Sequence, residues 1–258
     1  MSAITKHKHI GKCKICGKST LLTFEHMTPR TTYNSHAIKT WEGEEITKIM
    51  TGKTGKFTIN QRGSGDYLLC RKCNNNNGNW YVPGYDKIAK AIGHVIIKNP
   101  EIKNGTLIEI KLTQCNPLAF LKEIVSMICC KIDYNLTEKL GFGSFLLNKE
   151  ELLKNTDNFD ILFYAISDKI LSHSTGVTVI GKKGDKEELY NESILEIAFF
   201  PIGIILNLDP KIRIEYGISI KELFSVKYGN YDITVTLPYR ETPYHPLIKM
   251  FSEQIIKI

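Results

Sequence analysis

The chain has 258 residues, 42% hydrophobic and 24% charged, which suffices for a sizeable core and is typical of a globular protein. No apolar run approaches the roughly 18 residues of a membrane span, and the basic N-terminus lacks the apolar stretch of a secretory signal, so we expect a cytoplasmic protein with no membrane partner. Residues 1–100 carry 16 Lys or Arg against 6 Asp or Glu, as expected if this part binds a polyanion, although a solvated basic surface would look the same.

Residues 1–85 are rich in loops and glycines, and we expect them to form one small domain. Such a segment buries little apolar surface by itself and needs a staple, such as a structural metal. Its short apolar runs predict three strands, and a fourth segment could open a short helix. The predicted strands cover 21–24, 57–60 and 67–69, and the predicted helix covers 74–80.

Residues 86–258 have longer periodic stretches and predict a second domain of the α+β class with an antiparallel sheet. Apolar residues at helical spacing predict a helix over 86–98, and alternation predicts a strand over 106–113. Asn116 and Pro117 suit the cap and first residue of another helix. Further strands are predicted at 159–166, 176–180, 194–207 (broken by Pro201), 212–216 and 231–237.

Four of the seven cysteines form two Cys-x2-Cys pairs, which are Cys13 with Cys16 and Cys70 with Cys73. The odd total and the expected cytosolic location argue against disulfides. Two such pairs can supply the four thiolates of a tetrahedral zinc site, and two pairs of free thiols are the alternative. His7 or His9 could replace one of these ligands.

Between the cysteine pairs lies the sequence Thr-Phe-Glu25-His26-Met-Thr-Pro29-Arg30, and Asn74 directly follows Cys73. In this order the motifs resemble the HNH, or ββα-metal, endonuclease family, in a branch with four zinc cysteines and Asn in place of the final His. The resemblance covers about the first eighty residues. It implies a zinc-stabilised treble-clef module, followed here by the α+β domain.

The resemblance implies that His26 is the general base and that Glu25 and Asn74 bind a catalytic Mg²⁺ or Mn²⁺. The chemistry agrees, because an imidazole can deprotonate water at neutral pH and a hard cation stabilises the charge of the transition state. This chain departs from the family in two places. Asn77 stands where a Lys is common, and the middle Asn has no counterpart among residues 63–67, so that Asn34 and Asn60 are candidates to orient His26.

Basic residues near these motifs are candidates for phosphate contacts, and Trp80 and Tyr81 are candidates for stacking or packing. The basic candidates are Arg30, Lys53, Lys56, Arg62, Arg71 and Lys72.

The expected function is metal-dependent hydrolysis of DNA phosphodiesters, as in bacterial restriction or anti-phage defence. The alternatives are a zinc-stapled nucleic-acid binder without activity and a nuclease that cleaves RNA. Residues 86–258 would then select the substrate, regulate the nuclease, or bind a protein partner or a second copy of the chain.

Overall fold

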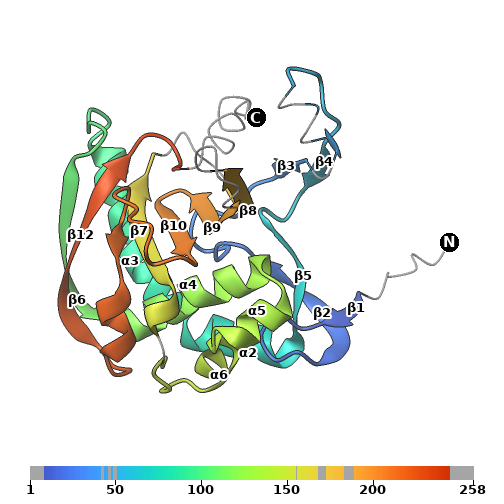
Figure 1. Cartoon of the computed structure of the whole chain (residues 1–258). Helices are drawn as coiled ribbons and strands as arrows, with labels where there is room; N and C mark the ends of the chain where they lie inside the picture. Colours follow the sequence, from blue (N-terminus) through green and yellow to red (C-terminus); the bar gives the residue numbers. More distant parts are fainter. Residues whose placement is uncertain are drawn as a thin grey trace, which may run out of the picture.

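The computed structural model describes residues 9–41, 44, 45, 48, 51–154, 156–167, 173–182 and 189–244. They form a mixed α+β fold, as predicted, with a small sheet near the N-terminus and a large sheet farther along the chain (Figure 1). No described helix is long and apolar enough to cross a membrane.

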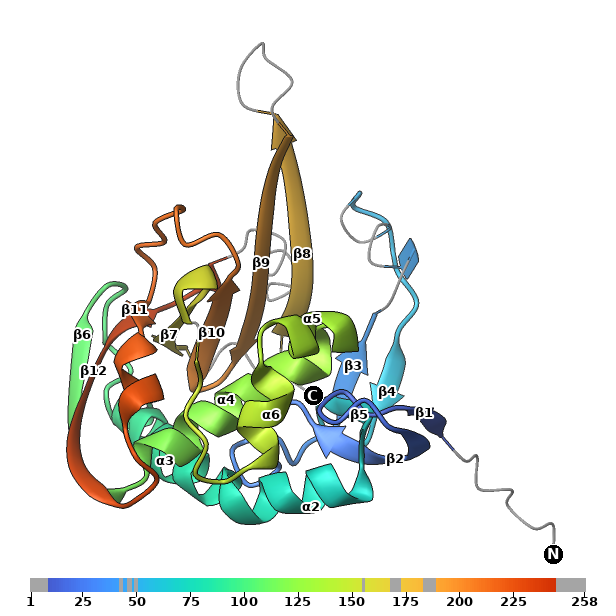
Figure 2. The same cartoon turned by 60° about the horizontal axis from the view of Figure 1, so that its bottom comes forward.

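The small sheet holds the predicted nuclease motifs. Its antiparallel strands lie in the order β1 (Ile10–Lys12), β2 (Ser19–His26) and β5 (Gly65–Cys70). The helix α2 (Arg71–Trp80) follows β5 without a loop. Between β2 and β5 the chain forms a separate two-stranded arm, β3 (Ile38–Thr40) with β4 (Thr58–Asn60), which stands apart from the helices (Figure 2).

Two long helices form the centre of the molecule. The first is α3 (Val82–Lys98), and the second is α4 (Pro117–Lys131), which begins as predicted because the Asn116 side chain accepts a hydrogen bond from the Ala119 N–H at 2.9 Å. Residues 117–130 are all buried, because α2, α3 and α6 (Phe142–Leu147) and the large sheet surround this helix. The short helix α5 (Tyr134–Lys139) packs on α6.

The large sheet has seven strands, of which six run side by side in the order β6, β12, β7, β10, β9, β8, while β11 pairs with β7. All pairs are antiparallel except the parallel pair of β12 and β7. The sheet thus has β6 at one edge and β8 at the other (Figure 1). The strand bounds are β6 Leu107–Cys115, β7 Asp160–Ile166, β8 His173–Lys182, β9 Leu189–Phe199, β10 Ile202–Asn207, β11 Ile218–Ser219 and β12 Tyr231–Arg240, with 3₁₀ turns at Thr156–Asn158 and Lys221–Ser225.

Along β7 both faces of this sheet are buried. Phe163 points toward the helices and contacts Phe120 of α4 edge to face, with ring centroids 5.9 Å apart. Its neighbour Tyr164 points to the opposite face and contacts Tyr216 in the same way at 5.1 Å. A smaller apolar cluster therefore covers the face away from the helices.

The prediction of a strand at 212–216 was wrong, because these residues form no strand. The backbone carbonyls here accept hydrogen bonds from side chains, with Asn207 Nδ2 donating to Ile212 and Arg240 Nε donating to Tyr216. The apolar alternation of this segment arises because it lies over the sheet and buries Ile214, without joining a strand. The other predicted elements overlap observed ones, and the run at 194–207 is divided at Pro201 into β9 and β10.

Apolar residues from both predicted domains belong to one cluster, from Ile15 in the first to Tyr239 in the second. The expected boundary after residue 85 lies inside α3. The segment that carries the nuclease motifs therefore packs directly on the centre of the molecule.

Candidate metal centre and nuclease site

The four predicted zinc cysteines converge. The Sγ atoms of Cys13, Cys16, Cys70 and Cys73 lie within 4.8 Å of one another, and those of Cys16 and Cys70 are 3.8 Å apart. Thiolates about 2.3 Å from a zinc ion at tetrahedral angles stand about 3.8 Å from each other. The cluster thus has the size and ligand type of a structural zinc site, which makes it a strong metal-binding candidate.

Local backbone geometry presents these sulfurs. Between the first pair and β2 the chain turns tightly at Gly17, whose φ of +69° favours glycine and whose N–H donates to the Cys13 carbonyl at 2.9 Å. Cys70 ends β5 and caps α2, because its sulfur accepts the Cys73 N–H at 3.5 Å. A strand end, a turn and a helix start therefore meet at one point.

The electrostatics of the cluster favour a cation. The hydrogen bond from Cys73 lowers the pKa of Cys13 to about 4, whereas the same bond and burial raise the pKa of Cys73 above its usual range. The cluster thus already stabilises a thiolate, the form that binds metal. Of the alternative ligands, His9 stacks on Tyr67 with ring centroids 3.5 Å apart, and His7 lies outside the described residues.

His26 ends β2, and its ring is held on one face of the small sheet. Its Nε2 lies 3.0 Å from the Arg62 carbonyl oxygen, and its ring packs edge-on against Phe24 at 5.1 Å. Because a carbonyl can only accept, Nε2 carries the proton and the neutral ring keeps a lone pair on Nδ1. Burial, together with the charges of Arg30 and Arg62, lowers the pKa of His26, so that the ring is neutral at pH 7.

Asn34 and Asn60 were the candidates to orient His26, and Asn60 is the one that contacts the turn whose carbonyl binds the ring. Its Oδ1 accepts the Arg62 N–H at 3.1 Å, which holds the turn whose carbonyl binds His26. Asn34 supports the same loop at another place, since its side chain exchanges hydrogen bonds with the backbone of Ser64 at 2.7 and 2.9 Å. Both residues were named as candidates from the sequence, although neither is well placed by spacing.

Glu25 and Asn74 lie on the other face of β2, toward α2. The Asn74 amide nitrogen donates to Thr23 Oγ1 at 3.1 Å and to the Phe24 carbonyl at 3.0 Å, which leaves its oxygen as the atom that could bind a cation. Burial raises the pKa of Glu25 to about 8, and a hydrogen bond from Asn77 opposes this shift. The structure therefore does not gather Glu25, His26 and Asn74 on a single face.

Within the part of the chain that the structure describes, the four cysteines are the only group of three or more His, Cys, Asp or Glu side chains that could hold a metal. A divalent ion at Glu25 would accordingly depend on Asn74 and on solvent or phosphate for its other ligands. An open coordination sphere of this kind is usual for Mg²⁺.

A buried acid behind Glu25 escaped the sequence analysis. Glu123 of α4 is 1% exposed, and its Oε2 has no hydrogen-bond partner within the described structure. Burial raises the pKa of Glu123 well above its usual range, and the charges of Glu25 and Asp86 add to this effect. The adjacent pair Lys122-Glu123 in an apolar helix was the available signal. Lys122 is buried too, and its Nζ donates to the carbonyls of Phe145 and Asn148.

The predicted phosphate-binding residues fall into three places. Arg30 and Arg62 act electrostatically on His26, and the Arg62 guanidinium lies over the Phe24 ring at 5.4 Å. Arg71 and Lys72 are exposed in the first turn of α2, beside the cysteines. Lys53 and Lys56 are exposed on the β3–β4 arm.

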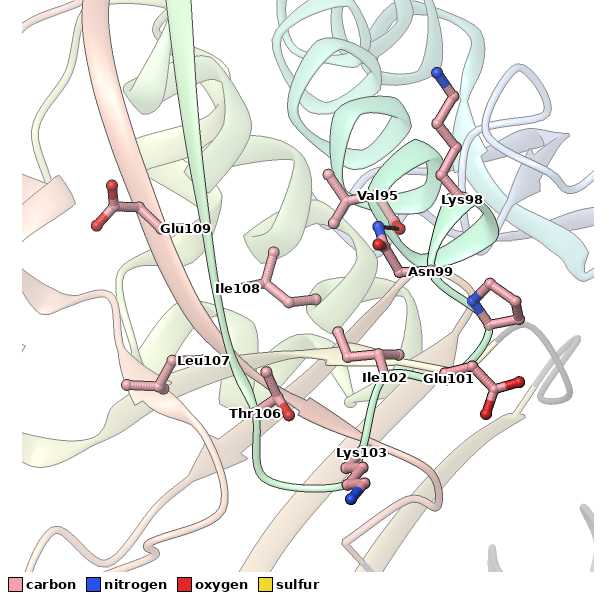
Figure 3. A pocket seen from close by; sticks show the side chains of 11 residues that line it. Val95, Lys98, Asn99, Glu101, Ile102, Lys103, Thr106, Leu107, Ile108 and Glu109 are labelled. Carbon is pink, nitrogen blue, oxygen red and sulfur yellow. Dashed lines mark hydrogen bonds between the residues drawn. The ribbon is translucent and has the colours of Figure 1, made fainter.

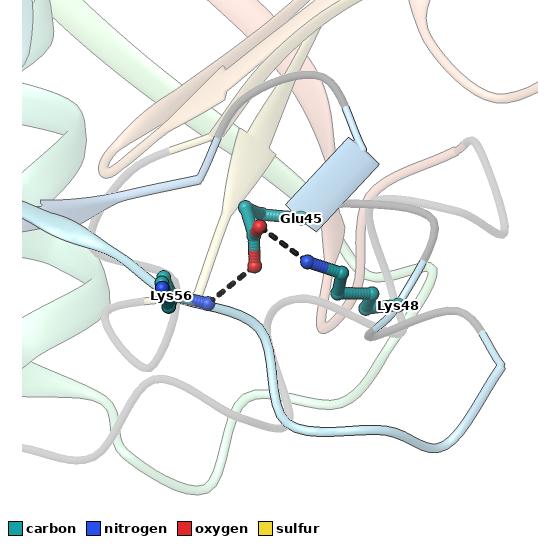
Figure 4. Close-up of polar contacts among 3 residues, drawn as sticks. All are labelled: Glu45, Lys48 and Lys56. Atoms are coloured by element: carbon teal, nitrogen blue, oxygen red, sulfur yellow. Dashed lines mark hydrogen bonds and ion pairs between the residues drawn. The ribbon is translucent and has the colours of Figure 1, made fainter.

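The arm has its own polar contacts. Glu45 accepts the Lys56 backbone N–H at 2.7 Å and pairs with the Lys48 ammonium at 2.5 Å (Figure 4). The contact with Lys56 uses its main chain, so the exposed side chain can still meet a phosphate. Trp80 is partly buried and Tyr81 fully buried in the main cluster, where both serve packing.

No protein-family model, curated protein or solved structure matches this chain. The assignment of its site therefore depends on the geometry above.

Proposed function

We propose that the chain is an HNH-type endonuclease that hydrolyses DNA phosphodiester bonds, with a treble-clef module stabilised by zinc. The observation that carries the proposal is the state of His26, a neutral imidazole of fixed tautomer with two arginines around it. A general base needs a free lone pair, and a polyanionic substrate needs positive charge beside that base. The convergence of four cysteines next to this strand is what the HNH resemblance leads one to expect.

In the proposed reaction, Nδ1 of His26 takes a proton from the attacking water. Arg30 and Arg62 hold the scissile phosphate and offset the negative charge that grows on its oxygens. A Mg²⁺ or Mn²⁺ ion held by Glu25 and Asn74 would stabilise the leaving oxygen. Since Glu25 and His26 project from opposite faces of β2, the substrate would have to meet both around the end of that strand.

A cleavage assay with plasmid DNA and Mg²⁺ or Mn²⁺ tests the proposal. We expect the wild type to cleave and His26→Ala to lose activity by a factor on the order of 10² to 10⁴. The matched control is His94→Ala, because His94 is exposed on α3 and should not affect cleavage. If both variants cleave as the wild type does, His26 is not the base and the proposal fails.

The same experiment with RNA separates the second candidate function, since the chemistry permits either substrate and no motif reads a 2′-hydroxyl. Binding of DNA without cleavage under every metal tested would favour the third candidate, a zinc-stapled binding protein. A role in restriction or anti-phage defence would require that expression lowers phage plating and that His26→Ala removes this effect. Residues 86–258 would supply substrate choice, regulation or partner binding.

A further inference from the structure

The strand β6 lies at an edge of the large sheet, and no other described strand pairs with its outer side. Pro238 of β12, which has no N–H, lies opposite Leu107, and the next residue, Tyr239, donates its N–H to the Thr106 carbonyl at 2.8 Å. Since successive residues of an antiparallel strand alternate in direction, the N–H and C=O groups of Leu107, Glu109 and Lys111 face away from β12. As far as the described residues go, this edge is regular and unpaired.

The side chains on this edge alternate as in a strand with one solvated face. Leu107, Glu109, Lys111 and Thr113 are exposed, and Leu107 is 63% exposed. Ile108 and Ile110 point inward and are buried. The inner side opens on a groove of about 680 Å³, in which Ile108 faces Val95 of α3 and Ile102, while Leu107 and Glu109 point to the other side (Figure 3).

We propose that β6 pairs antiparallel with β6 of a second copy of this chain, around a two-fold axis at Ile110. In this register Glu109 lies opposite Lys111 of the copy and Lys111 opposite its Glu109. Leu107 lies opposite Thr113, whose carbonyl accepts a hydrogen bond from Cys115 Sγ at 3.6 Å. The outward backbone groups of Glu109 and Lys111 therefore form the centre of the proposed pairing. The inward residues Ile108 and Leu112 also pair, which places Leu112 of the copy at the groove.

Charge complementarity selects this register and this occupant. A shift of one residue would set inward-facing backbone groups against outward-facing ones, so only shifts of two residues compete. The two nearest such registers place Glu109 opposite Glu109 or Lys111 opposite Lys111, and like charges directly opposite are unfavourable. The strand is therefore complementary to itself in one arrangement.

The edge is also bounded, which favours a closed dimer over an extended sheet. At its far end Gln114 has a φ of +53° and the ladder with β12 shifts register. There the Gln114 carbonyl accepts a hydrogen bond from Lys87 Nζ at 2.9 Å. Pairing is thus confined to a short segment, and a two-fold contact uses the same patch on both copies.

Sedimentation velocity of the zinc-loaded full chain over a range of micromolar concentrations tests this proposal. We expect a reversible dimer, and we expect Lys111→Glu and Glu109→Lys each to weaken it by roughly tenfold, because each places like charges opposite at two symmetric points. The double variant E109K/K111E should restore dimerisation. In the two competing registers this double exchange would restore nothing.

Glu109→Pro supplies an independent variant, since it removes an outward N–H and leaves the ladder to β12 intact. It should abolish the dimer without changing the urea midpoint at low protein concentration. The proposal would be overturned if the chain stayed monomeric at all concentrations, or if the single charge reversals left the dissociation constant of the dimer unchanged. Because the readout is mass, the result is independent of nuclease activity.

Discussion

The ring of His26 is tied through Nε2 to the carbonyl oxygen of Arg62, 3.0 Å away. This hydrogen bond to a main-chain carbonyl fixes the tautomer of the ring. The orientation of His26 therefore depends on the conformation of the turn that carries Arg62. Asn60 holds that turn through the Arg62 N–H. The short turn from Asn60 to Arg62 therefore orients a histidine that lies 36 residues earlier in the chain.

Asn60→Ala should lower the cleavage rate by about 10- to 100-fold, as loss of an orienting partner does, without loss of zinc. Asn60→Asp keeps an oxygen that accepts the Arg62 N–H and should retain more activity. The measurement is the single-turnover rate against pH, with zinc content as the check on folding. Equal rates for Ala, Asp and wild type would show that Asn60 has no positioning role.

Arg30→Ala and Arg62→Ala should each weaken DNA binding and reduce the slope of log affinity against log salt by about one, as expected for a lost phosphate contact. Fluorescence anisotropy with a labelled duplex at several salt concentrations measures this slope. Lys98→Ala is the control, because Lys98 is an exposed basic residue at the end of α3 that belongs to none of the three groups of predicted phosphate contacts. A slope that changes equally in the control would remove the special role of the two arginines.

Cys70→Ser distinguishes the two roles of Cys70, which are binding a metal and capping α2. Serine can still accept the Cys73 N–H at the start of α2, but it offers no thiolate, so we expect loss of one zinc ion per chain and of more than about 3 kcal/mol of unfolding free energy. Inductively coupled plasma mass spectrometry measures the zinc content, and urea unfolding measures the unfolding free energy. Cys115→Ser, outside the cluster, should keep its zinc. If the Cys70 variant keeps full zinc, the four-sulfur site is not the metal centre.

Glu123 predicts how stability depends on pH. Its pKa is raised well above its usual range in the folded chain, so above about pH 5 the folded state holds a proton that the unfolded state has released. Unfolding then releases a proton, and the free energy of unfolding should fall as pH rises through this range. Glu123→Gln should be more stable than wild type at pH 8 and should flatten the dependence.

Urea unfolding at several pH values, without added divalent cation, checks this behaviour. Glu138→Gln serves as control because Glu138 is exposed on α5, and its slope should match that of wild type. A Glu123→Gln variant that keeps the full wild-type slope would show that another group releases the proton.

The four-cysteine cluster could be predicted because its members form two short-range pairs of one residue type. The start of α4 could be predicted as well, because its signal is local: the capping residue Asn116 is followed directly by Pro117. Asn60 was a candidate to orient His26, but the way it acts could not be predicted, because it works through the backbone of a turn and not through a direct side-chain contact. Glu123 was missed because helical periodicity assumes one exposed face, whereas α4 is covered on every side.

The strand directs Glu25 and His26 to opposite faces, as alternation requires. How they act together is the question that the His26 and Asn60 variants address.

One hydrophobic cluster joins Ile15 to Tyr239, and α3 crosses the point where two domains were expected to meet. A fragment that stops at residue 85 would end within the first turn of that helix and lose its packing against α4. The cysteine-bearing segment is accordingly unsuited to being grafted onto another protein as a portable cassette. A transplant would have to carry α3 and α4 along, and with them the scaffold on which the large sheet rests.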